Sequence, residues 1–208
     1  SSSHGYAVIE DAGGGPWSGL VLFDSDVLSF ARGDSVVVTG TVQEYYGMTE
    51  LSYITDARII SSGHPLPAPQ DLTTGALMTS ADPEEWEGVL VRVQNVTVSN
   101  DSLGYGQWSV TDGSGDCIVD DLGDYTYEPY TGDSIQSIIG VCFYSFSEFK
   151  MEPRDDADID SAGDSEAVGR PYPFGLPAYP LPQGYAGFPS QVAFQQSRVG
   201  ECVPGVTG

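Results

Sequence analysis

The chain has 208 residues, which allows one large domain or two of about 100 residues each, and 40% of its residues are hydrophobic. Acidic residues outnumber basic ones by 30 to 7, so the formal net charge is −23. This charge repels the phosphate backbone of nucleic acids and anionic lipid, and we expect neither as a partner. The sequence also lacks the run of about 18 apolar residues that a membrane span needs, so we expect no membrane insertion.

Residues 1–62 are predicted to form a first unit built of short strands. An alternating segment at 4–10 and an apolar run at 18–23 flank a glycine-rich turn, and this order predicts a hairpin. A curved strand over 33–46 and a final strand over 49–54 follow. The unit is therefore expected to be all-β.

Residues 63–85 are rich in proline and are predicted to form an extended linker. The linker joins this unit to a second one at 86–160. The second unit begins with valines that recur two apart. These valines are Val89, Val91, Val93, Val96 and Val98, with a one-residue slip at Gln94 and Asn95. The pattern predicts a long β-strand that carries a bulge or bend.

The rest of the second unit repeats the first, which indicates an internal duplication of about 100 residues. The first unit has no counterpart of the valine-rich strand. The matched segments include Gly106–Asp112 with Gly5–Asp11, Gly140–Cys142 with Gly40–Val42, and Ser147–Phe149 with Thr49–Leu51.

Five strands per complete unit, a glycine-kinked central strand and little helical periodicity suit a Greek-key barrel of the oligonucleotide/oligosaccharide-binding (OB) type. The segments Trp17–Val21, Gly33–Val42 and Glu87–Val91 resemble secreted bacterial tandem OB-fold modules, including those that accompany extracellular nucleases and those proposed to build extracellular fibres. The resemblance implies OB barrels and a secreted, extracellular or cell-surface location. We therefore predict two tandem OB-fold barrels, the first lacking its own first strand, followed by an extended Pro-rich C-terminal tail.

The first strand of an OB barrel pairs on both sides, so a unit without it has two open edges, which must be covered. The tail, residues 161–208, alternates prolines with aromatic and aliphatic residues, and 191–199 reads as extended. We expect the tail to complete or cover the open barrel of the next subunit, giving a head-to-tail homo-oligomer. The tail could instead fold back onto its own barrel, or form a low-complexity segment. The predicted assembly residues are Tyr172, Phe174, Tyr179, Phe188, Val192 and Phe194.

Carboxylates gather in glycine-relaxed turns, and such oxygen ligands suit calcium, which would relieve their mutual repulsion. Calcium is accordingly the expected cofactor. The alternative is that they are solvated turn residues, because Asp and Gly dominate turns. The predicted calcium ligands are Asp112, Ser114, Asp116, Asp120 and Asp121 in one cluster, and Asp155, Asp156 and Asp158 in another.

Three cysteines lie far apart with no C-x-x-C pair, which argues against a zinc site. Cys117 and Cys142 are expected on strands of one barrel that could be neighbours, so a disulfide between them is plausible in an oxidising compartment. Unpaired cysteines are an equally good interpretation. If Cys117 and Cys142 form a disulfide, Cys202 would stay free or pair between chains.

Catalysis is not expected, because His4 and His64 are the only histidines and neither lies in a catalytic motif. The composition and the missing strand instead favour a structural subunit of a calcium-stabilised extracellular filament or matrix. The alternative is a secreted, non-catalytic OB-fold module that binds carbohydrate or single-stranded nucleic acid. Its aromatic residues would provide the stacking surface, but the basic groove that usually accompanies such a surface is absent.

Overall fold

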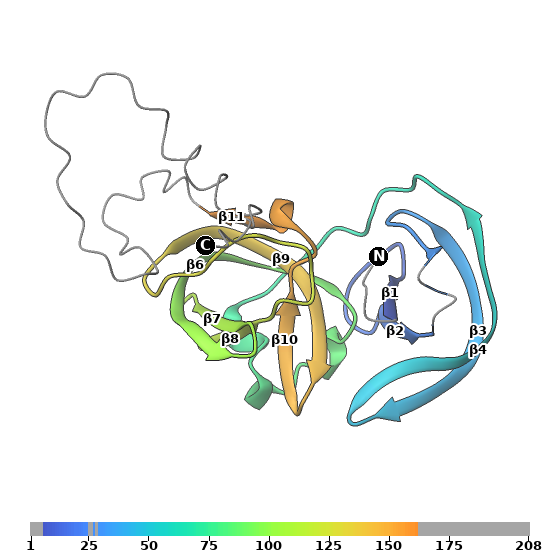
Figure 1. The fold of residues 1–208 in the computed structure, drawn as a ribbon, viewed down its shortest axis with the longest axis horizontal. Helices are drawn as coiled ribbons and strands as arrows, with labels where there is room; N and C mark the ends of the chain where they lie inside the picture. The colour runs from blue at the N-terminus through green and yellow to red at the C-terminus, as the bar shows by residue number, and fades with distance from the viewer. Residues whose placement is uncertain (1–5, 25–26, 28, 162–208) are drawn as a thin grey trace, which may run out of the picture. The chain divides into compact units, whose positions relative to one another are not determined.

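The computed structural model describes residues 6–24, 27 and 29–161, and this part of the chain is all-β (Figure 1). Strands are joined by turns and by single-turn 3-10 helices. These helices are η2 (Thr74–Ala76), η3 (Thr79–Ala81), η4 (Glu84–Trp86) and η5 (Asp156–Asp158). Within the described ranges, no helix is long and apolar enough to cross a membrane.

A four-stranded sheet forms the first part of the fold. Its strands are β1 (Tyr6–Glu10), β2 (Gly19–Phe23), β3 (Ser35–Tyr45) and β4 (Met48–Ser61), and they lie in the order β1-β2-β4-β3. The predicted hairpin is present as β1 and β2, which pair antiparallel. The strands β3 and β4 form a long antiparallel hairpin, and β2 runs parallel to β4.

Seven strands form the second sheet, in the order β11-β9-β10-β8-β7-β6-β5. An additional pairing of β6 with β9 closes five of them, β6 to β10, into a barrel. The strands are β5 (Gln70–Asp71), β6 (Leu90–Gly104), β7 (Gln107–Thr111), β8 (Asp116–Val119), β9 (Ser134–Ser145), β10 (Glu148–Glu152) and β11 (Ile159–Ser161). The predicted all-β class and a closed five-stranded, OB-like barrel are confirmed.

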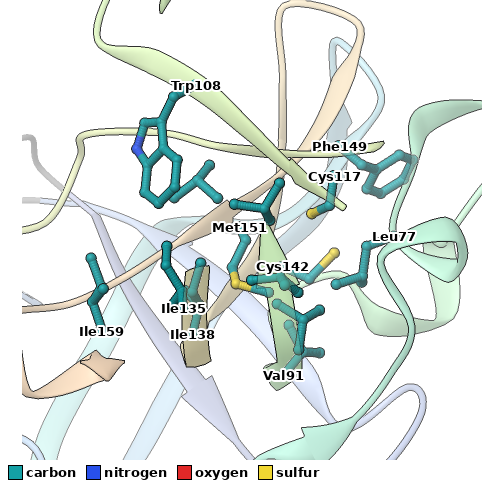
Figure 2. Close-up of a cluster of buried hydrophobic side chains, with 14 of the residues drawn as sticks. Leu77, Val91, Trp108, Cys117, Ile135, Ile138, Cys142, Phe149, Met151 and Ile159 are labelled. Carbon is teal, nitrogen blue, oxygen red and sulfur yellow. The ribbon is translucent and has the colours of Figure 1, made fainter. Parts of the chain in front are cut away.

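The main hydrophobic core fills this barrel (Figure 2). The five valines of β6 and its lead-in point inward and are all buried, together with Trp108 and Met151. The slip predicted from the sequence lies at Asn95, whose φ of 52° interrupts the alternation so that Val93 and Val96 both face the core. Burying each such side chain stabilises the fold by about 1.5–3 kcal/mol.

A smaller core lies on the first sheet. Among the described residues, its apolar cluster consists of Leu22, Val27 and Leu51, with partly buried neighbours that include Ala7 and Ile9. The two sheets belong to one compact unit. The first sheet therefore encloses much less apolar surface than the barrel does.

Candidate functional site

The closing strand of the barrel, β6, bridges two strands that would otherwise be edges. Residues Leu90 to Thr97 pair with β9, and residues Thr97 to Gly104 pair with β7. Thr97 itself lies between Ser134 and Thr111. Without β6, both β7 and β9 would present unpaired backbone groups.

Strand pairing aligns the four-stranded sheet with the barrel residue by residue. The parallel pair Val21 and Glu50 corresponds to Ile118 and Lys150. The hairpin pair Val42 and Leu51 corresponds to Cys142 and Met151. Strands β1, β2, β3 and β4 thus correspond to β7, β8, β9 and β10, and Lys150 rather than Glu148 is the counterpart of Glu50. The predicted repeat alignment of Thr49–Leu51 with Ser147–Phe149 was wrong by two residues, because it matched similar residue types rather than the strand register.

The edges of the four-stranded sheet are the strands that correspond to the partners of β6. Order β1-β2-β4-β3 leaves one side of β1 and one side of β3 without a partner strand among the described residues. Side-chain exposure follows the same division: Val42 on β3 is 64% exposed, whereas its counterpart Cys142 is 1% exposed. We call the space between these two edges the open slot.

The central strands of both sheets bend at a glycine with close backbone contacts. A Cβ on Gly140 would lie 2.5 Å from the Met151 side chain and 2.9 Å from the backbone of Glu152. On Gly40 it would lie 2.8 Å from the carbonyl oxygen of Ser52. The open sheet therefore keeps the same bend that lets the barrel close.

Three backbone amides connect the first sheet to the segment that leads into β6. Leu90 N donates to Glu10 Oε2 at 3.2 Å, and Thr49 N donates to Glu87 Oε1 at 2.7 Å. Trp17 N donates to the carbonyl oxygen of Glu85 at 2.7 Å. Burial raises the pKa of Glu87 to about 7, although the Thr49 hydrogen bond lowers it, and neighbouring carboxylates add to the rise.

A buried ion pair lies between β8 and β10 in the barrel. Lys150 Nζ contacts Asp120 Oδ2 at 3.0 Å, and both side chains are almost fully enclosed. Burial, together with the Asp120 carboxylate, raises the pKa of the nearby Glu152 to about 8. Its Oε1 atom is buried with no hydrogen-bond partner among the described residues. Lys150 is the only lysine of the chain, and its isolation in the sequence was a signal that sequence analysis overlooked.

The predicted calcium ligands of the β7–β8 turn are engaged by protein donors. Asp112 accepts hydrogen bonds from the amides and hydroxyls of Thr74 and Ser114, which lower its pKa to about 2 despite desolvation. Asp116 lies exposed at the start of β8. The two remaining members of this cluster lie beyond β8, where Asp120 accepts a hydrogen bond from Lys150. Asp121 lies beside Gly106, away from the turn.

The second predicted calcium cluster is also divided among different partners. Asp155 pairs with Arg32, Asp156 accepts from Thr126, and Asp158 pairs with Arg154 at 2.6 Å. Among the residues that the structure describes, no group of three or more His, Cys, Asp or Glu side chains is placed to hold a metal ion. Among the described residues, the eight predicted ligands therefore do not converge on one point.

The predicted disulfide is not formed, and Cys117 and Cys142 are both buried free thiols (Figure 2). Their strands, β8 and β9, are not neighbours, because β10 lies between them in the sheet. Adjacent strands are about 4.8 Å apart, so two intervals exceed the usual Cα separation of a disulfide within a sheet. Burial raises the pKa of the Cys117 thiol to about 12.

The six predicted assembly residues, Tyr172, Phe174, Tyr179, Phe188, Val192 and Phe194, lie outside the described residues, as does Cys202. Of the aromatic residues considered for stacking, Trp108 is buried and donates to Tyr125, whereas Tyr45 and Tyr46 are exposed at the β3–β4 turn. Comparison of the chain with protein-family models, curated proteins and solved structures found no match.

Proposed function

We propose that this protein is a non-catalytic structural subunit that assembles head to tail, each subunit filling the open slot of the next with a strand from its C-terminal tail. On this proposal the four-stranded sheet is an OB barrel built without its first strand, in tandem with the closed barrel. One observation carries the proposal: the two free edges, β1 and β3, correspond to the two strands that β6 joins in the barrel.

The physical reason is the cost of leaving such edges exposed. Unpaired backbone groups along β1 and β3 are a template for pairing with another strand. An extended segment that enters between them gains hydrogen bonds on both sides and buries the partly exposed inner face. Because the donor segment and the slot are different surfaces of one chain, the contact is heterologous and propagates into a filament unless a ring closes.

Secretion and calcium belong to the same proposal. Secretion rests on the acidic, lysine-poor composition and on the resemblance to secreted OB-fold modules. Calcium rests on the high density of carboxylates, whose repulsion in a packed filament would favour a bound cation. Isothermal titration with calcium and melting with and without chelator test this part. No heat of binding and an unchanged melting temperature would remove calcium from the proposal.

Negative-stain microscopy and light scattering of the purified full-length protein test the assembly. We expect filaments from the full chain and soluble monomers after deletion of residues 163–208. Deletion of 203–208 alone provides the matched control and should retain filaments. Uniform monomers from the full chain would contradict assembly and would favour the alternative, a monomeric module that binds carbohydrate through exposed aromatics such as Trp17, Tyr46 and Tyr53.

A further inference from the structure

The inner face of β3 differs from that of β9 in one respect that constrains the incoming strand. On β9 the buried residues Ile135 and Ile138 are three apart, which matches the interrupted alternation of β6. On β3 the less exposed positions Val36, Val38 and Gly40 alternate without interruption. A strand that pairs with β3 must therefore present an inward side chain at every second residue, without the slip that β6 has at Asn95.

Building on the proposed function, we infer that the open slot binds residues 188–194 of a second copy of this chain, with Phe188, Ser190, Val192 and Phe194 facing inward. The antiparallel pairing of β6 with β9 sets the register of this placement. Phe188 lies opposite Gly40, Ser190 opposite Val38 and Val192 opposite Val36.

The inward positions fit the space that the first sheet leaves. In the barrel, the position next to the final inward valine, Val98, is filled by the large side chain of Trp108. The register of β1 and β2 places Ala7 at the equivalent position of the first sheet. Phe194 would lie beside Ile9, whose neighbour on the same face of β1 is Ala7. Its ring would fill the space that Trp108 fills in the barrel.

The composition of the tail favours the stretch 171–197, which contains this segment, over the charged ends of the tail. No charged residue occurs between Arg170 and Arg198, although the whole chain carries a net charge of −23. An uncharged segment enters an apolar slot without the cost of burying a charge. A strand over 191–199 that alternated from Val192 would place Arg198 inward, which the apolar slot disfavours.

The stiffness of the preceding chain favours a second copy over the same chain. The 26 residues 162–187 separate β11 from the inferred strand and span at most about 90 Å when extended. Five prolines between 171 and 182 favour an extended, semi-rigid spacer, and such a spacer resists folding back onto its own chain.

Cysteine cross-linking in the full-length protein tests the register and the partner together. In a Cys202→Ser background, Val37→Cys with Gln191→Cys places the two thiols opposite each other on the outer face. The matched control, Val37→Cys with Gln195→Cys, pairs only if Val192 rather than Phe188 lies opposite Gly40. After oxidation we expect a ladder of disulfide-linked multimers from the first pair and at least tenfold less from the control.

Light scattering recorded before oxidation shows whether polymers form, and this separates the possible outcomes. If polymers form but the ladder appears in the control pair, the inferred register is wrong and the proposed assembly stands. The same holds if polymers form and neither pair cross-links. Cross-linked single chains overturn the choice of a second copy. An absence of polymers in the Cys202→Ser background overturns the proposed function itself, and this inference with it.

Discussion

The closed barrel and the four-stranded sheet are built from matching strands, yet they differ in what completes them. In the barrel, β6 supplies its valines to a core that also holds Trp108, and the sheet has no free edge between β7 and β9. In the first sheet the same bend and the same strand order end in two open edges and a core of three buried residues. One strand thus separates a barrel that closes within the chain from a sheet that keeps two open edges among the described residues.

Matched aspartate substitutions at equivalent positions give the largest expected difference. Cys142→Asp buries a carboxylate in the closed core and should unfold the barrel, with a loss of about 4 kcal/mol or more. Val42→Asp, at the exposed counterpart, should change the free energy of unfolding of the monomer by about 0.5 kcal/mol or less, yet abolish filaments. Urea unfolding and light scattering measure the two effects. Filaments that persist in Val42→Asp would show that the slot is not the assembly surface.

Lys150 and Glu50 occupy equivalent positions, and Lys150 forms the buried ion pair with Asp120. Lys150→Met should destabilise the barrel by about 3–5 kcal/mol, because it leaves the Asp120 carboxylate buried without a cation. Arg58→Met removes the exposed pair with Asp56 and should cost about 1 kcal/mol or less. Chemical denaturation of both variants checks the difference. Equal losses would mean that the Lys150 pair contributes no more than a surface pair.

Stability is also expected to depend on pH. The pKa values of Glu87 and Glu152 are raised from 4.5 to about 7 and about 8 in the folded protein. Between pH 5 and 8 the folded state therefore binds more protons than the unfolded state, and the free energy of unfolding should fall as the pH rises. The lowered pKa of Asp112 acts only below about pH 4.

Denaturation midpoints of the wild type at pH 5 and pH 8 measure this fall. The double variant Glu87→Gln with Glu152→Gln should flatten the dependence, because its side chains stay uncharged throughout the range. This control separates the two buried carboxyls from the general repulsion of a chain with a net charge of −23. A midpoint that rises with pH in the wild type would contradict the raised pKa values.

Local patterns in the sequence predicted much of the architecture. The alternating valines of β6, its slip at Asn95 and the hairpin of β1 and β2 all follow from side-chain periodicity and turn residues, which act over a few neighbouring positions. These features are fixed by short-range preferences, so the sequence alone determines them.

Only the tertiary structure decided which side chains meet across the sheet. It separated Cys117 from Cys142 by placing β10 between their strands, and it gave the predicted calcium ligands to partners such as Thr74, Arg154 and Lys150. It also showed that Lys150 and Glu50 occupy equivalent positions of the two sheets. Such pairings depend on strand order and register, and these arise from the burial of whole sheet faces rather than from any local run of residues.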